Sequence, residues 1–272
     1  MQKTLLWLVC FSIFIIGCAR KEKGIIRIKG SDTEVNLVQK LAEKFIEINP
    51  KLSIAVTGGG SGVGISALIN SETDIANSSR QMKEEEIEKA KENGINPVAT
   101  VFALDRLAII ANSSLVIGSL TIDTLGKIYR GEITNWNSIG GPDVAITLYG
   151  RTSASGTYLY FREKVLQGEY SPDMKQMIGT SQIVEAIKRD KGGIGYVGIG
   201  YLKEAEGVKQ INIAKDKDSS YISPLEKGYP LERELYQYTN GEPSSDILNF
   251  IQFELGEEGQ RIVAEEGFYP VK

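Results

Sequence analysis

The chain has 272 residues and a formal net charge of −4, and it contains no histidine. The absence of histidine excludes Ser-His-Asp and Cys-His catalysis as well as zinc sites with histidine ligands. The length suits one large or two medium-sized α/β domains, and because no basic stripe is present we expect no nucleic acid partner.

The N-terminus has the features of a secretory signal. An apolar run from Leu5 to Ile16 follows a single positive charge and is shorter than a membrane span, as is typical of signal peptides. Residues 15–18, Ile-Ile-Gly-Cys, resemble a bacterial lipobox, whose cysteine is lipidated and becomes the first mature residue. We therefore expect a lipoprotein signal peptide at 1–17, a lipidated Cys18 and a tether at 18–23. The alternative is an ordinary signal peptide with an incidental cysteine.

The first half of the mature chain alternates strands with helices. Apolar spacing and turn residues predict strands at residues 25–28, 52–57, 74–77, 98–104 and 107–111. The same signals predict helices at 34–48, between the Gly58–Gly64 loop and Asn70, and at 83–93 with a stop at Gly94. This βαβ order favours a mostly parallel sheet with helices on its faces.

The second half continues the pattern. Its predicted elements are helices at 121–129, 156–165, 181–190 and 245–265 and strands at 144–149 and 193–197. Polar residues 215–230 are expected to form a connector. Residues 193–198 match the GxGxxG pattern, but they follow a helix rather than a strand, so a dinucleotide site is not expected there. The chain also has no P-loop motif, so the expected ligand is a small free oxyanion.

Residues 151–157, Arg-Thr-Ser-Ala-Ser-Gly-Thr, form the most informative motif. Arg151 offers paired donors to a tetrahedral oxyanion, and the hydroxyls of Ser155 and Thr157 add neutral donors. Gly156 lets the backbone come close to a ligand, and the first N–H groups of a helix are unpaired. The motif therefore predicts an oxyanion site. The alternative is an ordinary helix cap with a nearby surface arginine.

Three further strand-to-helix junctions carry similar side chains. We number the loops as the first at residues 30–33, the second at 58–64, the third at 155–157 in the Arg151 motif and the fourth at 78–80. Open α/β sheets bind ligands at the carboxyl ends of their strands, so we expect the four loops to meet at one anion. Each loop alone would more simply be a turn or a helix cap. Together the loops contribute the predicted binding residues Ser31, Asp32, Thr33, Ser61, Ser79, Arg80, Arg151, Ser155, Gly156 and Thr157.

Five stretches of the chain together resemble the phosphate-binding protein of the bacterial phosphate ABC transporter, the Pst system. They are Gly-Ser-Asp-Thr at 30–33, Gly-Gly-Ser-Gly at 59–62, and the segments 74–80, 128–136 and 151–157, in matching order and spacing. The resemblance implies an α/β fold of the type II periplasmic-binding-protein kind, with two lobes joined by a two-crossing hinge. It places one lobe at 24–104 plus 225–272 and the other at 105–224.

The resemblance also implies roles for single residues. It implies phosphate contacts for the second and third loops through Ser61, Arg151, Ser155, Gly156 and Thr157. Asp32 and Thr33 fall where the family uses a side chain and a backbone N–H. Ser79 stands where several members carry an aspartate that accepts the phosphate proton, and Asp32 is the substitute acceptor that we expect.

The function implied by the resemblance is that of a lipid-anchored, monomeric receptor outside the cytoplasmic membrane, on its periplasmic or cell-surface side. It would bind inorganic phosphate and deliver it to ABC permease subunits, without a cofactor, a metal or enzymatic activity. One alternative is a binding protein for sulfate, molybdate or tungstate. Another is a phosphate-ester hydrolase that uses Ser155 or Ser61, for which the chain offers no histidine base and no evident acidic cluster.

Overall fold

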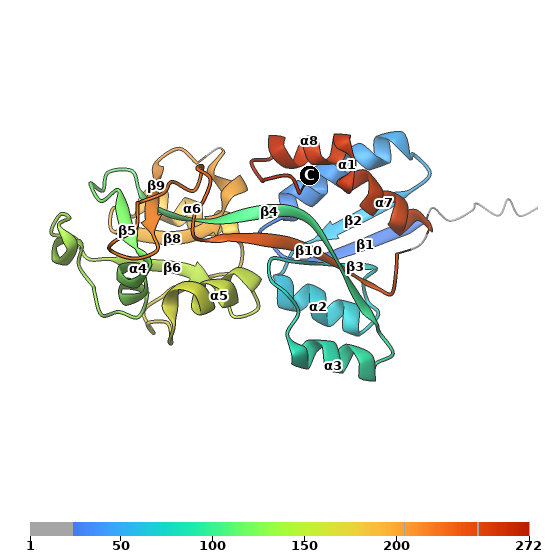
Figure 1. The fold of residues 1–272 in the computed structure, drawn as a ribbon, viewed down its shortest axis with the longest axis horizontal. Helices are drawn as coiled ribbons and strands as arrows, with labels where there is room; N and C mark the ends of the chain where they lie inside the picture. Colours follow the sequence, from blue (N-terminus) through green and yellow to red (C-terminus); the bar gives the residue numbers. More distant parts are fainter. Residues whose placement is uncertain (1–23, 204, 244, 272) are drawn as a thin grey trace, which may run out of the picture.

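The computed structural model describes residues 24–203, 205–243 and 245–271. It has two α/β lobes joined by two long strands, β4 (Pro97–Asn112) and β10 (Glu232–Asn240), which pair with each other (Figure 1). The predicted two-lobed architecture with two crossings is thus confirmed. The predicted signal peptide, Cys18 and tether lie outside the described residues. Within the described ranges, no helix has both the length and the apolar character needed to cross a membrane.

The lobe on the right of Figure 1 is built around parallel strands. β1 pairs in parallel with both β2 and β3, and β10 adds to β3 in the antiparallel sense. Helices α1, α7 and α8 lie on one side of these strands and α2 and α3 on the other (Figure 1). The bounds are β1 Ile25–Gly30, α1 Val35–Ile48, β2 Ser53–Thr57, α2 Ser61–Ile69, β3 Ile75–Ser78, α3 Glu84–Glu92, α7 Ser245–Leu255 and α8 Glu257–Glu265.

The lobe on the left of Figure 1 continues the same sheet beyond β4. β4 pairs antiparallel with β8 and β9, whereas β6 pairs in parallel with β7 and β8. The bounds of the strands are β5 Ser119–Thr121, β6 Thr147–Arg151, β7 Lys175–Met177, β8 Gly193–Gly198 and β9 Val208–Ala214. Those of the helices are α4 Ile122–Tyr129, η1 Trp136–Ile139, α5 Gly156–Phe161, the π-helix η2 Arg162–Leu166, α6 Thr180–Arg189 and η3 Ile199–Leu202.

The sheet differs from the predicted one in three respects. The strand order is β2-β1-β3-β10-β4-β8-β6-β7, and the sheet is mixed, because the pairings of β4 and β10 at its centre are antiparallel while those of β1 and β6 on either side are parallel. The strands expected at 98–104 and 107–111 are one strand, because Asp105 and Arg106 stay in the ladder with β10. Strands β5, β7, β9 and β10 were not predicted.

The long helix expected at 245–265 is also wrong, because the chain forms two helices that meet at Gly256. Glycine is a poor helix former, and the Gly256 N–H bonds to the Phe253 carbonyl in a tight turn. Gly259 then passes so close to the end of α7 that an added Cβ would lie 2.3 Å from the Phe253 carbonyl oxygen. The glycines therefore let α8 fold back against α7.

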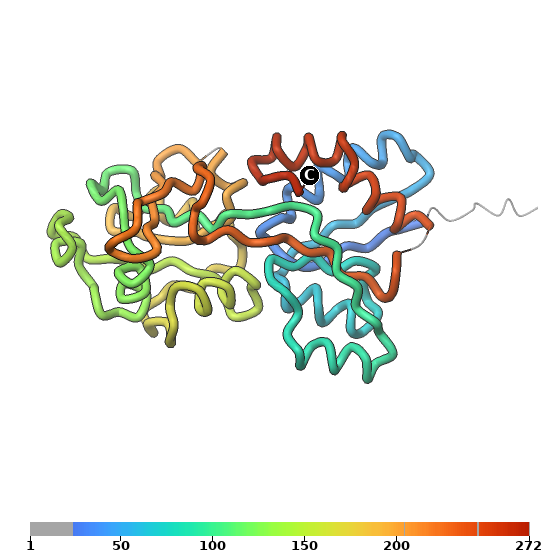
Figure 2. Tube along the Cα trace, in the orientation of Figure 1, coloured from blue at the N-terminus to red at the C-terminus, as the bar shows by residue number. Residues whose placement is uncertain are grey.

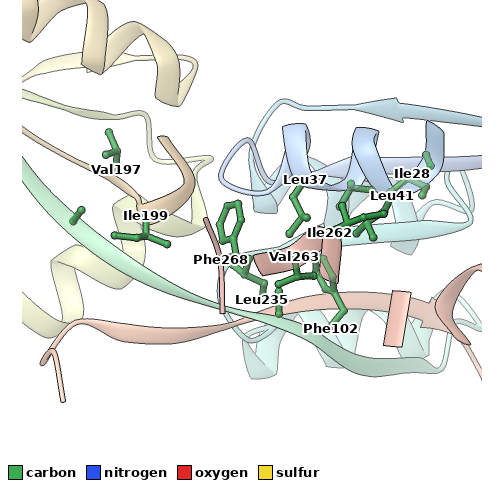
Figure 3. Packing of buried hydrophobic residues seen from close by; sticks show 14 of the residues in the cluster. Ile28, Leu37, Leu41, Phe102, Val197, Ile199, Leu235, Ile262, Val263 and Phe268 are labelled. Atoms are coloured by element: carbon green, nitrogen blue, oxygen red, sulfur yellow. The ribbon is translucent and has the colours of Figure 1, made fainter. Parts of the chain in front are cut away.

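One hydrophobic core includes side chains from the helices and from β4 and β10, the two strands that run between the lobes. Leu37 and Leu41 of α1 belong to one buried cluster with Phe102 of β4 and Leu235 of β10, and this cluster extends to Ile199 in the other lobe (Figure 3). The chain passes between the lobes along β4 and again along β10 (Figure 2). Because the core continues onto both strands, the loops at the ends of β1, β2, β3 and β6 are held on well-packed elements.

Candidate functional site

The four predicted loops carry six buried hydroxyl side chains, of which Thr33, Ser61, Ser79 and Thr157 contact one another while Ser31 and Ser155 accept a hydrogen bond from their own loops. Each belongs to a residue that is at most 2% exposed, and the six are Ser31, Thr33, Ser61, Ser79, Ser155 and Thr157. The loops that carry them follow β1, β2, β3 and β6 and lead into α1, α2, α3 and α5. The structure therefore brings together the hydroxyls that the sequence places at separate junctions. We refer to these six residues as the hydroxyl cluster.

Hydrogen bonds connect the cluster across the two lobes. The hydroxyl oxygens of Thr33 and Thr157 lie 2.8 Å apart, although the residues come from opposite lobes. The Ser79 hydroxyl lies 3.5 Å from that of Thr157 and 3.4 Å from that of Ser61. These hydroxyls can rotate to donate or to accept, so the same groups can turn toward an anion.

Gly156 is required for the close approach of the third loop to the second and fourth. A Cβ at this position would lie 2.4 Å from the Ser61 hydroxyl and 2.8 Å from that of Ser79. Ser155 caps α5 by accepting a hydrogen bond from the Thr157 N–H at 3.2 Å. The predicted motif thus combines a helix cap at Ser155 with close contact between Gly156 and the other loops.

Arg151 lies at the end of β6 and is buried, with 1% of its surface exposed. Its Nη1 donates to the Thr180 hydroxyl at 2.6 Å, and its Nη2 donates to the Ile178 carbonyl at 2.6 Å. Nη2 also donates to Asp32 of the other lobe at 2.5 Å. The guanidinium is therefore held rigidly between the lobes and bonds directly to the first loop.

The partners of Asp32 link the first loop to its neighbours. Its Oδ1 accepts a hydrogen bond from the Gly59 N–H at 2.9 Å, and its Oδ2 accepts the bond from Arg151. Its backbone carbonyl accepts a hydrogen bond from the Tyr201 hydroxyl at 2.6 Å. Asp32 was expected to accept the phosphate proton in place of the missing aspartate. In the structure, both of its carboxylate oxygens already accept hydrogen bonds from protein donors.

Arg80 is the predicted binding residue that the structure does not bring into the hydroxyl cluster. Its two terminal nitrogens each donate to a different carboxylate oxygen of Glu86, both at 2.7 Å. This fork-to-fork pair holds the start of α3 and lowers the pKa of Glu86. Arg80 therefore holds the start of α3 through Glu86, and it lines the same cavity as Ser79, which joins the cluster.

Sequence reasoning missed a buried ion pair beside the cluster. Arg233 of β10 donates from Nε and Nη2 to the Asp105 Oδ2, at 2.8 and 2.7 Å. The same Nη2 lies 3.1 Å from the Thr157 hydroxyl and 3.4 Å from that of Thr33. The alternation of Leu231, Arg233 and Leu235 on one face was the available signal, because it indicates a strand with an inward-pointing arginine.

A cavity of about 660 Å³ opens next to the cluster between the lobes, lined among others by Ser79, Arg233 and Tyr160. Ser79 and Arg233 belong to both the cavity wall and the hydrogen-bond network of the cluster, and Glu163, Glu232 and Glu234 also line the cavity. For the part of the chain that the structure covers, no group of three or more acidic, histidine or cysteine side chains is placed to hold a metal ion.

Comparisons with known proteins agree with this arrangement. A family model described as a PBP superfamily domain matches residues 19–258. The phosphate-binding protein PstS of Borreliella burgdorferi is 30% identical over 286 residues, which cover 100% of both chains. PstS of Bacillus subtilis is 32% identical over 253 residues, covering 92% of this chain and 82% of that protein.

Solved structures show the same similarity. A crystal structure with bound phosphate from Clostridium perfringens, described as a phosphate ABC transporter substrate-binding protein, has a TM-score of 0.82 and 29% identity. The match covers 92% of this chain and 100% of that one. An ABC-type phosphate transport receptor from Vibrio cholerae has a TM-score of 0.70 and 27% identity, over 90% of this chain and 99% of that one.

Proposed function

Because the chain belongs to the PBP superfamily, and within it to the PstS phosphate-binding proteins, we propose that it is a receptor that binds inorganic phosphate between its two lobes and delivers it to an ABC permease. The relatives with these names are binding and transport proteins rather than enzymes. The protein would not change phosphate chemically. It would bind phosphate in preference to other anions and release it to the permease.

The meeting of hydroxyls from both lobes, next to an Arg151 that bonds across the lobes to Asp32, is the observation that carries this proposal. A tetrahedral oxyanion needs many donors around it, and buried donors that remain unpaired would destabilise the fold. Six buried hydroxyls and a rigid guanidinium supply donors from four directions. Anion contacts would replace the bonds that the hydroxyls now make with one another.

Contacts between the lobes support a mechanism of domain closure. Thr33 and Asp32 of the first lobe bond to Thr157 and Arg151 of the second, and the Gly62 N–H donates to the Ala154 carbonyl at 3.0 Å. A phosphate bound by both lobes would favour the closed state over the open one by its extra contacts in the closed form. The lobes would be residues 24–104 with 225–272, and residues 105–224, with the hinge in β4 and β10.

Membrane attachment and delivery complete the proposed function. The lipobox-like residues 15–18 support lipidation of Cys18, which would hold a monomeric receptor at the outer side of a bacterial membrane near its permease. The test is metabolic labelling of the full chain with a radioactive fatty acid, with Cys18→Ser as the control variant. Labelling of the unmodified chain alone is expected, and equal labelling of both would reject the assignment.

Isothermal titration tests the ligand class. The purified protein is freed of bound anion and titrated with phosphate and then with sulfate, molybdate and tungstate at neutral pH. One-to-one binding of phosphate in preference to the other anions is expected. Tighter binding of another oxyanion would change the ligand class, and turnover of a generic phosphomonoester would reject the binding-only function.

A further inference from the structure

Two tyrosine hydroxyls connect the two ends of the Arg151 motif. The backbone N–H of Arg151, at the end of β6, donates to the Tyr196 hydroxyl at 3.1 Å. The hydroxyl oxygens of Tyr196 and Tyr170 lie 3.2 Å apart, and the Tyr170 hydroxyl donates to the Tyr158 carbonyl at 2.9 Å. These four residues form one connected set of hydrogen bonds, which we call the tyrosine relay.

The relay has a single direction, because each phenol has only one proton to donate. The Tyr170 proton lies on the bond to the Tyr158 carbonyl, since a carbonyl oxygen can only accept. The Tyr196 hydroxyl therefore donates to the Tyr170 oxygen and accepts from the Arg151 N–H. Each donor of the relay has an acceptor, and hydrogen bonds aligned in this way strengthen one another.

Ring packing and burial hold the two phenols in place and keep them protonated. The Tyr196 ring is stacked on that of Phe161 with 4.3 Å between the centroids, and the Tyr170 ring is stacked on that of Tyr158 at 4.4 Å. Burial raises the pKa of Tyr196 to about 12 and that of Tyr170 well above its ordinary value. Both hydroxyls therefore remain available as donors at neutral and mildly alkaline pH.

The GxGxxG pattern at 193–198 has a structural explanation in this arrangement. These residues form β8, in which every residue is buried. The Tyr196 hydroxyl comes so close to β6 that a Cβ at Gly150 would lie 2.8 Å from it. A Cβ at Gly195 would lie 2.5 Å from the Ile183 Cγ2. The glycines therefore let α6 and β6 pack closely around β8, which brings a tyrosine to the end of β6.

The relay reaches the opposite lobe through the Arg151 motif. Arg151 enters the relay with its backbone N–H, while its Nη2 donates to Asp32 of the other lobe at 2.5 Å. Within the motif, the Ala154 carbonyl accepts a hydrogen bond from the Gly62 N–H of the second loop at 3.0 Å. A change in the position of the motif would therefore change the contacts between the lobes.

We propose that Tyr196 and Tyr170 are positioning residues of the anion site, which hold the ends of the Arg151 motif so that its donors are arranged before an anion binds. The inference rests on the proposed function and adds residues that act through the loop. One end of the relay is Arg151, and the other is Tyr158, which directly follows Thr157. A loop fixed at both ends loses less freedom on binding, so the anion is bound more tightly.

Amide hydrogen exchange of the anion-free full chain tests the relay itself. Tyr196→Phe keeps the ring but removes the acceptor of the Arg151 N–H. The reference is the buried N–H of Ile213, which bonds to the Ile222 carbonyl in the same lobe. Relative to this reference, exchange at Arg151 should become at least about fivefold faster in the variant. A general loss of stability would speed both amides alike, so an unchanged ratio would overturn the relay.

Isothermal titration with phosphate tests the consequence for binding. Tyr196→Phe should bind phosphate about fivefold more weakly, because the anion must then order the motif. Tyr170→Phe leaves the bond between Arg151 and Tyr196 in place and should also weaken binding, which provides the test if Tyr196→Phe does not fold. The double variant should bind about as well as Tyr196→Phe, because either change breaks the same relay. Losses that multiply would overturn the relay.

Tyr129→Phe is the matched control. The Tyr129 ring lies 5.6 Å from that of Tyr196, but its hydroxyl donates to the carbonyls of Tyr149 and Ile194, outside the motif. This variant should lose stability yet keep its phosphate affinity within about twofold. An equal loss of affinity in Tyr129→Phe and Tyr196→Phe would overturn the positioning role. An unmodified protein that binds no phosphate would reject the proposed function, while the Arg151 exchange ratio would still decide the relay.

Discussion

Arg151 and Arg80 illustrate why residue type alone does not define a binding residue. Both follow strands and both were predicted to contact the anion. Arg151 forms its ion pair with Asp32 across the two lobes, whereas Arg80 forms its ion pair with Glu86 of the same lobe. The partners of each arginine, rather than its position in a motif, decide how much charge it can direct at an anion.

Substitution of these arginines should therefore have unequal effects on phosphate affinity. Arg151→Ala should weaken binding by at least about tenfold, because a charge-assisted donor between the lobes is lost. Arg80→Ala should cause a smaller loss, since its ion pair with Glu86 joins residues of one lobe and leaves the bond between the lobes intact. Isothermal titration with phosphate measures both, and circular dichroism checks that each variant is folded. The reverse order of effects would contradict this assignment.

The buried glutamates predict how stability depends on pH. Burial raises the pKa of Glu34 to about 8 and that of Glu254 well above its ordinary value, so the folded chain holds these protons more tightly than the unfolded chain. This contribution to stability is complete in acid below the ordinary glutamate pKa and is lost as the pH rises through the folded pKa. The chain has no histidine to obscure the effect at intermediate pH.

The free energy of unfolding should accordingly fall between about pH 5 and pH 8, by up to about 1.4 kcal/mol per pH unit for each of the two glutamates. Urea unfolding at constant ionic strength measures the decline. The double variant Glu34→Gln, Glu254→Gln should show a much flatter curve. An unchanged slope in the double variant would mean that neither carboxyl is protonated in the folded protein.

The sequence predicted the hydroxyl residues that come together better than it predicted the charged residues beside them. Ser61, Ser155 and Thr157 stand in short motifs whose residue types already indicate anion contact. Glu34 was assigned only to the start of a helix, because nothing in the local sequence reveals that its side chain is fully buried. Asp105 and Arg233 are 128 residues apart, so their pairing depends on the assembled fold.

At the level of elements, the close packing of α2 on β1 positions the second loop. A Cβ at Gly64 would lie 2.3 Å from the Lys29 carbonyl oxygen and 2.6 Å from the Gly30 Cα, which are backbone atoms that cannot move aside. Gly118, in contrast, has open space around it. The glycine-rich loop at 58–64 therefore lets α2 pack closely on β1, in addition to letting the backbone approach a ligand.

Gly64→Ala should lower the free energy of unfolding by about 1 to 3 kcal/mol, because an added methyl group would overpack the contact between α2 and β1. Gly118→Ala is the control, and its stability should stay within about 0.5 kcal/mol of the unmodified protein. Chemical denaturation compares the two. Equal stability of both variants would show that α2 can shift away from β1 without cost.

Local patterns predicted some elements well and others poorly. The helix at 34–48 and the strand at 52–57 have strong periodicity and match α1 and β2 within one residue. Strand β10 was missed because its polar residues Glu232, Arg233, Glu234 and Gln237 conceal the strand pattern. The antiparallel place of β10 between β3 and β4 is set by tertiary pairing, which no single segment encodes.

On the scale of the whole molecule, two crossing strands and a shared hydrogen-bond network connect the lobes. The C-terminal segment packs beside the hinge, where Tyr269 and Leu104 of the same lobe exchange backbone hydrogen bonds. Arg106 of β4 stacks on the Tyr269 ring with 3.8 Å between its Cζ and the ring centroid. The C-terminal segment thus reinforces one side of the hinge. The candidate site is formed by hydrogen bonds between the lobes, to which a bound anion can add its own contacts.

Small-angle X-ray scattering should detect closure on ligand binding. The radius of gyration of the anion-free protein should decrease when phosphate is added, because contacts from both lobes stabilise the closed state. Arg151→Ala should show a smaller decrease at the same phosphate concentration. An identical radius with and without saturating phosphate would indicate that the lobes are already closed without ligand.

A crystal structure of the protein with phosphate tests the central claim most directly. The account predicts one phosphate between the lobes, with oxygens within hydrogen-bonding distance of Arg151, Ser155, Thr157 and at least one hydroxyl of the first two loops. Phosphate bound elsewhere, with the hydroxyl cluster still closed on itself, would contradict it.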